Sequence, residues 1–393
     1  MSVIIFGDLF TFPEGYAATN RAYMYAKGFS ENSIRASVVC FSSEYLKVSD
    51  GIIDEIPYYH PFGQEKRSNS FVIRRWQNLM KYYRTYVLFK KIHKEDKIVA
   101  VNSWTNLLLT HTFAWFLCKI FKARLIPEIS EHPLRYYQQG FFKKKIGVLK
   151  FHIETRLSDG FFCISRYLIN FYKQQGVNTK KLFLVPSIID PSRFSKVSER
   201  PFSHSYIGYF GSLTFERDNV DLLINAFEKF ARLHPDIHLV LGGFCTDAQK
   251  KQISNLISKL DIDTKVTLLD RLTKDEITKY VAHASILVMV RTKGLESDAS
   301  FPSKLTEFLA TGKPVISVNV GEIPDYLSDG VNVFLTEPGN AQELTNKLIY
   351  IANDYAVAER VSKQGKSLTL DSGVFNYSYQ TRRMIDFINS LHK

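Results

Sequence analysis

Short apolar runs alternate with amphipathic stretches along the whole chain. In the first half, the runs that we expect to form strands are Val3–Phe6, Ala36–Phe41, Ile98–Asn102, Ala123–Pro127, Gly160–Ile164 and Lys181–Val185. In the second half they are Ser205–Phe210, Ile237–Leu241, Lys265–Leu269, Ile286–Val290, Pro314–Val318 and Val331–Leu335. Helical patterns follow most of these runs, which is typical of parallel sheets with helices on both faces. The pattern predicts an α/β protein with two doubly wound units.

A polar stretch with charges of both signs divides the two halves. It carries Pro191 and Pro201, and it reads as a linker between two lobes. At 393 residues the chain is long enough for two lobes that each bury a core. The predicted parts are a first domain over 1–190, a linker over 191–204, a second domain over 205–372 and a C-terminal helix within 373–393.

Charge and cysteine content narrow the class of protein. The net charge of +12 indicates an anionic partner, which could be a nucleic acid, an anionic membrane surface or a phosphorylated substrate. The four cysteines, Cys40, Cys118, Cys163 and Cys245, form no CxxC pair, so we expect neither a disulfide framework nor a zinc site. The N-terminus lacks a signal-peptide pattern, and the longest apolar run, 107–121, is shorter than the about 20 residues of a spanning helix. We expect a cytoplasmic protein.

Two segments of the second half carry candidate chemistry. After the strand at 205–210, Gly211 and Ser212 form a turn that allows backbone amides to approach a phosphate. No GxGxxG accompanies this turn, which argues against a dinucleotide cofactor. Further on, Pro302 and Ser303 begin a helix, with the serine available as a cap, and Gly312 ends it. This helix start lies at the carboxyl edge of a parallel sheet, where open α/β sheets bind ligands.

Here the sequence resembles the family 4 glycosyltransferases, which have the GT-B fold of two Rossmann-like doubly wound domains facing an interlobe cleft. The run Pro302–Ile316 is similar to the donor-site signature of that family, and the resemblance covers Tyr206–Pro338. Segments 162–168 and 185–194 of the first half also resemble family segments. The resemblance implies that the C-terminal helix returns to the first domain, which would bind the acceptor.

The resemblance also implies donor-binding roles. Arg217 would bind the diphosphate of a nucleotide sugar, and Arg291 would face the donor. Backbone amides at Ser303, Lys304 and Leu305 would hold phosphate oxygens, with the Lys304 side chain adding charge, and Glu307 would accept hydrogen bonds from the ribose. The remaining donor-binding candidates are the turn residues Gly211 and Ser212 together with Gly15.

Two positions depart from the family pattern. The family commonly has two glutamates with seven residues between them; Glu307 matches the second, but Ala299 stands at the first. Glu296 and Asp298 are near that position but off register, in what reads as a polar loop. Many members carry an arginine directly after the turn glycine, where this chain has Ser212. Recognition of the donor sugar therefore stays open.

In the first half, polar residues follow the strand at 123–127. Strand alternation places Glu128 and Ser130 on one face, with Glu131 and His132 in the following loop. The family often has a histidine at the position of Ser130, so Glu131, Glu128 or His132 is the candidate to stabilise positive charge on the sugar or to guide the acceptor hydroxyl. In the loop before the first helix, Gly15 permits close approach of the backbone to a ligand.

Two basic-aromatic stretches, 74–91 and 135–146, allow more than one interpretation. They could dock on anionic lipid, with aromatic rings at the headgroup level, or form helices with solvated lysines and aromatic core residues. No nucleic-acid-binding module accompanies them, so no nucleic-acid partner is expected.

The sequence thus predicts a transferase that moves a sugar from a UDP- or GDP-linked donor to a glycan or lipid-linked acceptor, as in bacterial surface-polysaccharide synthesis. The resemblance implies retention of configuration, no metal and no cofactor. Asp261-Ile262-Asp263 reads as a solvated turn at the opposite sheet edge. The alternatives are a nucleotide-sugar epimerase of the same fold and a non-catalytic binding protein. We expect a cytoplasmic protein that either stays free or associates with the inner face of the membrane.

Overall fold

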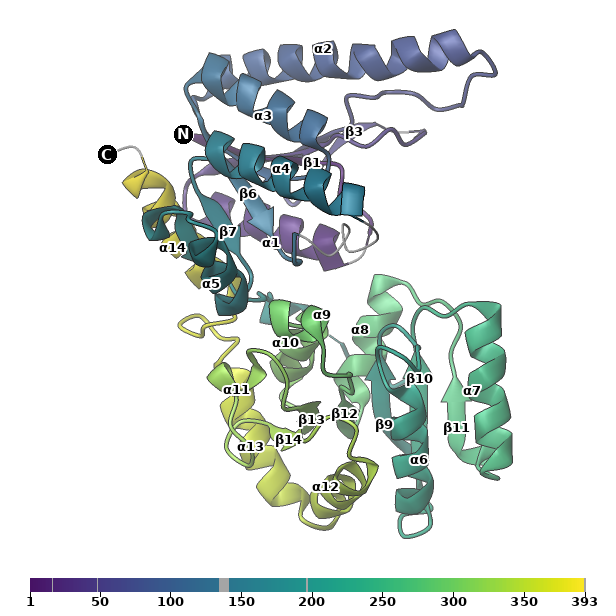
Figure 1. Ribbon diagram of the computed structural model, residues 1–393. Coiled ribbons are helices and arrows are strands. Elements are labelled where there is room, and N and C mark those ends of the chain that lie inside the picture. The colour runs from purple at the N-terminus through teal and green to yellow at the C-terminus, as the bar shows by residue number, and fades with distance from the viewer. Residues whose placement is uncertain (16, 48, 134–140, 196, 392–393) are drawn as a thin grey trace. The chain divides into compact units, whose positions relative to one another are not determined.

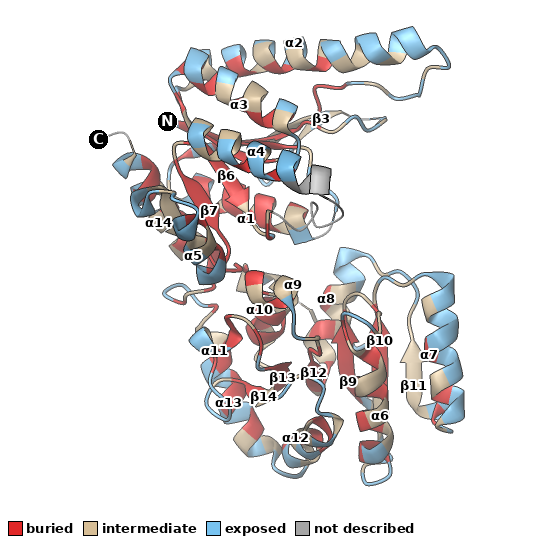
Figure 2. Ribbon diagram, in the orientation of Figure 1, coloured by how far each residue is buried: buried red, intermediate tan, exposed pale blue. Residues whose placement is uncertain are grey.

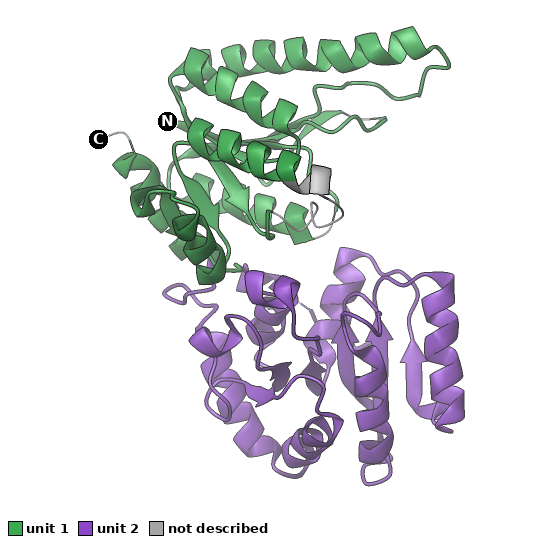
Figure 3. Ribbon diagram, viewed as in Figure 1, with its two compact units in different colours: residues 1–188, 377–393 green, residues 189–376 purple. Residues whose placement is uncertain are grey.

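The computed structural model describes residues 1–15, 17–47, 49–133, 141–195 and 197–391. The chain divides into two compact units, of which the first comprises Met1–Ile188 and Tyr377–Lys393 and the second Ile189–Asn376 (Figure 3). Each unit has its own sheet with helices on both faces (Figure 1). The strands are mostly buried, whereas the helices are exposed along their outer sides (Figure 2).

In the described part of the first unit, the strand order is β3-β4-β2-β1-β5-β6-β7-β8. The strands are β1 (Ser2–Gly7), β2 (Arg35–Cys40), β3 (Asp50–Ile53), β4 (Ile56–Tyr59), β5 (Ile98–Trp104), β6 (Arg124–Ile129), β7 (Phe161–Cys163) and β8 (Leu182–Leu184). All neighbours pair in parallel except β3 with β4. The six strands predicted for this half are confirmed.

The antiparallel hairpin β3–β4 was not predicted from the sequence. Its turn residues Asp54 and Glu55 both have positive φ, at 44° and 65°. Two-residue hairpin turns of this kind are usually recognised by a glycine or an asparagine, which Asp-Glu does not provide. The two strands are also only four residues long, so alternation along them is a weak signal.

The first unit has six α-helices and a 3-10 turn in its described part, of which α2 and α3 pack on a core that includes Ile4, Phe6, Leu117 and Leu125. These elements are α1 (Ala17–Glu31), α2 (Phe71–Glu95), α3 (Leu108–Phe121), α4 (Phe141–Leu157), α5 (Arg166–Gln174), the 3-10 turn η2 (Thr179–Lys181) and α14 (Tyr377–Ser390). The C-terminal helix α14 packs against α1, and Phe387 stacks on Phe183 with ring centroids 4.8 Å apart. No helix in the described residues is both long and apolar enough to cross a membrane.

In the second unit the strand order is β11-β10-β9-β12-β13-β14, and every described pairing is parallel. The strands are β9 (Ser205–Phe210), β10 (Ile237–Gly242), β11 (Val266–Leu268), β12 (Ile286–Val288), β13 (Val315–Val318) and β14 (Phe334–Thr336). Its helices are η3 (Pro191–Phe194), α6 (Val220–Ala231), α7 (Asp247–Lys259), η4 (Asp263–Lys265), α8 (Lys274–His283), α9 (Leu295–Ala299), α10 (Ser303–Thr311), α11 (Ile323–Tyr326), α12 (Ala341–Asn353) and α13 (Tyr355–Ser367). The six strands predicted for this half are confirmed.

The described residues of the segment 191–204, which the sequence suggested as a linker, belong to the second unit. Arg193 in η3 accounts for this, because it donates hydrogen bonds to Thr278 Oγ1 and to the carbonyl of Lys274. Its guanidinium also pairs with Glu307 at 3.3 Å. A proline-rich polar segment reads as a linker, but these long-range contacts hold its first turn on α8 and α10.

Candidate functional site

The strand order of the second sheet reverses direction between β9 and β12. The chain runs from β9 outward through β10 to β11 and then returns to β12 on the other side. At such a switch point the two connecting loops diverge and leave room for a ligand at the carboxyl ends of the strands. The turn at Gly211 follows β9, and Arg291 follows β12. The site predicted from the sequence therefore lies at this switch point.

Backbone segments approach each other closely at the turn after β9. Gly211 N–H donates to the Gly242 carbonyl at 2.9 Å. Gly243 has φ of 141°, and a Cβ there would lie 1.8 Å from the Gly211 carbonyl oxygen. A Cβ on Gly211 itself would lie 2.6 Å from Lys304 Nζ. The turn therefore needs small residues, and it brings the Lys304 ammonium group directly over the end of β9.

Lys304 is held above this turn by Tyr209 and Asp218. Its ammonium donates to the Tyr209 hydroxyl at 3.0 Å and lies 4.5 Å from the centre of that ring. Asp218 Oδ1 is 3.8 Å away. Burial lowers the pKa of Lys304 to about 8, an effect that Asp218 opposes and that Arg291 and Arg217 reinforce. A bound anion would therefore stabilise the protonated form of Lys304.

Two arginines complete the cationic group. Arg217 extends from the turn between β9 and α6, is half exposed, and lies 3.4 Å from Asp218 and 3.8 Å from Glu296. Arg291 donates to the Glu296 carbonyl and to Ser300 Oγ, both at 3.2 Å. Burial and then the nearby Arg217 lower the pKa of Arg291. We call Arg217, Arg291 and Lys304 the cationic cluster.

The carboxylates around the cationic cluster do not neutralise its positive charge. Asp218 is buried and accepts a hydrogen bond from Thr214 Oγ1 at 2.7 Å. Its distances to Lys304 and Arg217 exceed the 2.7–2.9 Å of a strong charged hydrogen bond. The contact between Arg217 and Glu296, at 3.8 Å, is as long as that between Lys304 and Asp218. The cluster therefore keeps positive charge at the edge where α10 begins.

The N-terminus of α10 differs in one detail from the prediction. Pro302 occupies the cap position and makes no side-chain capping bond, and Ser303 is the first helical residue, so the expected serine cap is wrong. The amide of Leu305 already donates to the Pro302 carbonyl at 3.1 Å. The first amides of a helix lack partners within the helix, so those of Ser303 and Lys304 are better placed for an anion than that of Leu305.

Two other predicted features of this edge change in the structure. Glu307 is paired with Arg193, so a ribose would have to share this carboxylate with the arginine. Glu296 and Asp298, expected in a loop, lie in the short helix α9, which Ser297 stabilises by donating to the carbonyls of Gly294 and Thr292. Ala299, at the position of the family's first glutamate, is buried. Ser212 uses its carbonyl to accept from the Tyr209 hydroxyl at 2.8 Å.

At the carboxyl edge of the first unit, Glu128 is fully engaged. Arg21 Nε donates to Glu128 Oε1 at 2.8 Å, and Tyr25 donates to Oε2 at 3.1 Å. The remaining guanidinium nitrogens of Arg21 donate to the carbonyls of Pro186 and Val185. The Glu128 side chain is wholly buried, and burial raises its pKa while Arg21 opposes the rise. The catalytic role of Glu128 stays a prediction, and this burial argues against direct contact with a substrate.

The other candidates of the first unit lie in or beside loops. Glu131 is exposed, whereas His132 is buried against Phe171, with ring centroids 4.5 Å apart. Burial lowers the pKa of His132 below its ordinary value. Gly15 stands just before α1, where a Cβ would lie 2.1 Å from Thr19 Oγ1, so the loop requires glycine there. These positions are compatible with the predicted roles and do not test them.

Sequence reasoning missed three residues that build the cationic cluster and its surroundings: Tyr209, Asp218 and Arg193. Tyr209 could have been noticed as an inward-facing residue at the end of a strand, but its contact with Lys304 joins positions 95 residues apart. Asp218 directly follows Arg217 in the sequence, but its contact with Lys304 joins distant positions. In the described residues, no group of three or more His, Cys, Asp or Glu side chains is placed to hold a metal ion.

Residues 193–368, which include all of these donor-site candidates except Gly15, match the model of the family "Glycosyl transferases group 1". This segment is therefore similar to group 1 glycosyl transferases. The whole first unit lies outside the match, and its C-terminal helix follows the matched range.

Relatives and solved structures point to the same class. An uncharacterized glycosyltransferase of Methanocaldococcus jannaschii is 26% identical over 220 residues, which cover 56% of this chain and 57% of the relative. The N-acetyl-alpha-D-glucosaminyl L-malate synthase of Bacillus anthracis is 24% identical over 234 residues, 56% of each chain. The chain thus spans somewhat more than half the length of these relatives.

The structure of HepE from Anabaena in complex with UDP is 15% identical and aligns over 99% of this chain and all of that one, with a TM-score of 0.70. This similarity shows the fold, and the GT-B prediction with its two Rossmann-like domains is confirmed. The residues that match the group 1 model lie in the second of the two units.

Proposed function

We propose that this chain is a glycosyltransferase that moves a sugar from a UDP- or GDP-linked donor to a hydroxyl of a glycan or lipid-linked acceptor. The observation that carries the proposal is the cationic cluster, which lies at the N-terminus of α10 and at the switch point of the sheet, within the segment that matches the group 1 glycosyl transferases. Solved structures of HepE hold UDP and UDP-glucose, which supports a nucleotide-sugar donor for a chain of the same fold.

The cationic cluster fits the charge that such a reaction develops. When the bond between the sugar and the diphosphate breaks, negative charge grows on the diphosphate, and fixed cations lower the energy of that state. Arg217 can bind phosphate oxygens with two parallel hydrogen bonds, and the α10 amides add the positive end of a helix dipole. We include transfer without a metal and with retention of configuration in the proposal. Both rest on the family resemblance.

In the acceptor half, Glu131 and His132 remain our candidates for assisting the transfer. Glu131 is exposed at the loop after β6, where it can meet a ligand. His132 keeps its ring against Phe171 and stays neutral near pH 7 because burial lowers its pKa. Either residue could orient the acceptor hydroxyl or stabilise positive charge on the sugar ring.

A thermal-shift screen against UDP, GDP, ADP and their sugars tests the donor site. A ligand at about 100 times its dissociation constant stabilises a protein by about 2.7 kcal/mol. We expect one nucleotide to raise the melting temperature, and Arg217→Ala to make that rise clearly smaller. If well-folded protein responds to no nucleotide at high concentration, the donor-site assignment fails.

Incubation of the matching nucleotide sugar with acceptor glycans and lipid-linked acceptors then tests the reaction. The proposal predicts release of nucleoside diphosphate only when an acceptor is present. Conversion of the nucleotide sugar without any acceptor would favour an epimerase. Binding without turnover, over a broad acceptor set, would favour a non-catalytic binding protein.

Membrane contact through α2 forms part of the proposed function. The first half of α2 exposes Phe71, Val72, Trp76, Leu79 and Tyr83, each more than half exposed (Figure 2). Arg74, Arg75, Arg84, Lys90 and Lys91 lie on the same helix. Aromatic and apolar side chains combined with cations suit the headgroup region of an anionic bilayer. The second basic-aromatic stretch, 135–146, lies largely outside the residues whose side chains are described.

Sedimentation with lipid vesicles tests this contact. The protein should bind vesicles that contain about 30% anionic lipid more strongly than neutral ones, because each basic residue near the surface contributes about 1 kcal/mol. The pair Trp76→Ser and Leu79→Ser should reduce binding. Leu233→Ser is a matched control, since Leu233 in the second unit is 63% exposed, as Leu79 is. Equal loss in control and test variants would contradict a specific role for α2.

A further inference from the structure

A cavity opens at the amino edge of the second sheet, away from the cationic cluster. It has a volume of about 410 Å³. Its walls come from the starts of β9, β10 and β12, the residue Lys313 before β13, and the ends of α8 and α12. The cationic cluster lies at the other ends of these strands. Six residues of β9 at about 3.3 Å each separate the two places by roughly 20 Å.

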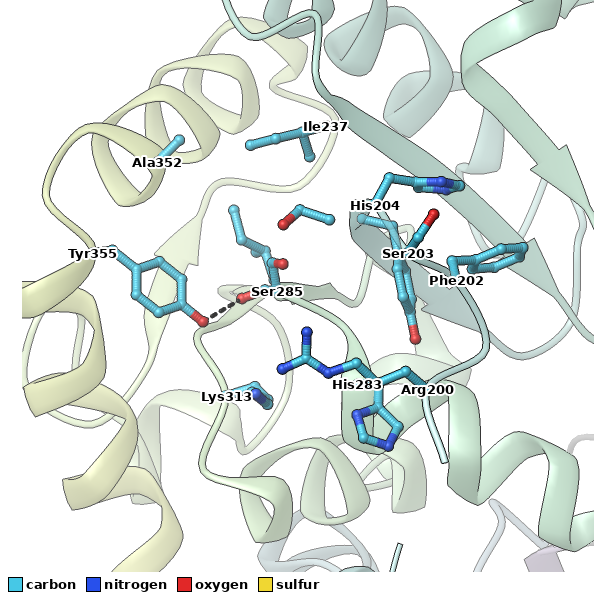
Figure 4. Close-up of a pocket in the computed structure, with 13 residues that line it drawn as sticks. Arg200, Phe202, Ser203, His204, Ile237, His283, Ser285, Lys313, Ala352 and Tyr355 are labelled. Carbon is cyan, nitrogen blue, oxygen red and sulfur yellow. Dashed lines mark hydrogen bonds between the residues drawn. The ribbon is translucent and has the colours of Figure 1, made fainter. Parts of the chain in front are cut away.

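Basic side chains gather in this cavity. Arg200, His204, His283 and Lys313 are among its lining residues, which include no carboxylate in the described part of the chain. Figure 4 shows Arg200, His283 and Lys313 below Ser285, with His204 on the other side of the cavity. Neither the Arg200 nor the Lys313 side chain forms an ion pair within the described residues. Glu199, which precedes Arg200 in the sequence, is paired with Lys279 at 2.7 Å.

Two imidazole nitrogens of the cavity are buried without a partner. Nε2 of His204 and Nε2 of His283 form no hydrogen bond within the described residues. Buried polar atoms of this kind normally find a partner in the protein, an ordered water or a ligand. The tyrosine hydroxyls nearby do not serve them, because Tyr355 donates to the Ser285 carbonyl and Tyr206 to the Tyr280 carbonyl.

The electrostatics of His283 agree with a site that accumulates positive charge. Burial lowers its pKa most, followed by Arg200, Lys313 and Lys279. The carbonyl ends of α8 and α12 at this edge attract cations weakly, which explains some basic residues there. Helix carbonyls do not explain the two imidazole nitrogens that lack partners.

We propose that this cavity is a second anion site of the second unit, which binds a small phosphate-class anion such as pyrophosphate. Arg200 and Lys313 supply the fixed charge, and the imidazole groups of His204 and His283 supply further hydrogen bonds. Aromatic walls from Phe202, Tyr206 and Tyr355 limit the cavity to a small ligand. The site is separate from the donor site and does not depend on the proposed transfer reaction.

Calorimetric titration of the full-length chain with pyrophosphate tests the proposal. The cationic cluster can also bind pyrophosphate, so the starting protein is the variant Arg217→Ala/Lys304→Ala. We expect this variant to retain one pyrophosphate site. Adding Arg200→Gln and Lys313→Gln should weaken that site at least tenfold. The matched control adds Lys251→Gln and Lys259→Gln, which remove the same charge from exposed positions of α7 in the same unit.

Two calorimetric results would overturn the proposal. One is the absence of pyrophosphate binding in the donor-site variant, which would place all binding in the cationic cluster. The other is an equal loss of affinity in the cavity variant and the α7 control, which would mean binding by overall charge alone. Failure of the donor-site proposal would look different, because nucleotides would then produce no thermal shift in the unaltered protein.

Histidine NMR on the unaltered chain gives an independent readout, in which a cavity variant serves only to assign the signal. The signal of His283 is identified by its loss in His283→Gln. A bound anion offsets the charges of Arg200, Lys313 and Lys279, so pyrophosphate should move this signal and raise the pKa of His283. By linkage, protonation of His283 then favours the bound anion. A signal and a pKa that pyrophosphate leaves unchanged would contradict the site.

Discussion

The carboxyl edges of the two sheets both carry arginines and carboxylates, but they use them differently. In the first unit, Arg21 is buried and makes close contacts with Glu128 and two carbonyls, at 2.6–2.8 Å. In the second unit, Arg217 is half exposed, and its nearest carboxylate oxygens are 3.4 and 3.8 Å away. A cation whose hydrogen bonds are all satisfied by the protein stabilises the fold. A cation that is loosely paired at a switch point is ready for a ligand.

The comparison shows that residues of the same chemical type can have different roles in the two units. Arg21 and Glu128 have the chemistry of a catalytic pair and lie at the sheet edge where such a pair belongs. Their mutual contact and burial nevertheless leave little of either side chain accessible to a substrate. In the second unit, Lys304 and Arg291 pay a desolvation cost that is reflected in their lowered pKa values. A bound diphosphate would reduce that cost.

The largest expected effect breaks the buried pair of the first unit. Glu128→Ala should lower the free energy of unfolding by about 3–5 kcal/mol, because it leaves the Arg21 charge buried and unpaired. Urea denaturation measures the loss. The double variant Arg21→Met/Glu128→Leu should recover part of it, since it removes both charges. A Glu128→Ala protein that is as stable as the original but has lost sugar transfer would instead make Glu128 a catalytic residue.

Arg217→Ala should weaken ligand binding and leave stability nearly unchanged, whereas Glu128→Ala should mainly lower stability. Losing a charged hydrogen bond to a phosphate costs about 1.5–3 kcal/mol, which corresponds to roughly 10- to 150-fold weaker nucleotide binding. Stability should change by no more than about 0.5 kcal/mol, because the side chain is half exposed. Calorimetry and urea denaturation of one preparation measure both quantities. Arg217→Lys keeps the charge without the planar fork and should bind with intermediate affinity.

Because of Lys304, we expect nucleotide binding by the second unit to depend on pH. Its pKa of about 8 means that the ammonium loses its proton as pH rises from 7 to 9. Nucleotide affinity should therefore fall over this range, by at most about tenfold per pH unit above the pKa. Lys304→Arg, which stays charged, should flatten the profile. An unchanged slope in that variant would show that another group titrates.

Glu307→Gln is expected to have the smallest effect. We expect the affinity for the matching nucleotide to fall severalfold, because a hydrogen bond to the ribose contributes about 0.5–1.5 kcal/mol. Pyrophosphate, which has no ribose, should bind as before and serves as the internal control. If both ligands bind more weakly, then Glu307 acts through its ion pair with Arg193 rather than through the ribose.

Local pattern was sufficient for the fold class and for the helix boundaries at the predicted donor site. The twelve strands predicted from apolar runs are present. Within the run Pro302–Ile316, α10 begins after Pro302 and ends before Gly312, where φ is 73°. These features depend on neighbours in sequence, such as apolar spacing, prolines and glycines, so they are readable without a structure. The family resemblance then indicated the cationic residues.

Contacts between distant residues were decided only by the tertiary structure. Arg21 meets Glu128 across 107 positions, Lys304 meets Tyr209 across 95, and Arg193 meets Glu307 across 114. Burial and pairing at these contacts determine whether a charged side chain stabilises the fold or can bind a ligand. These contacts cannot be predicted from any local sequence pattern. The amino-edge cavity has the same origin, because its lining residues come from five separate segments, and its basic residues from three of them, that only the folded sheet brings together.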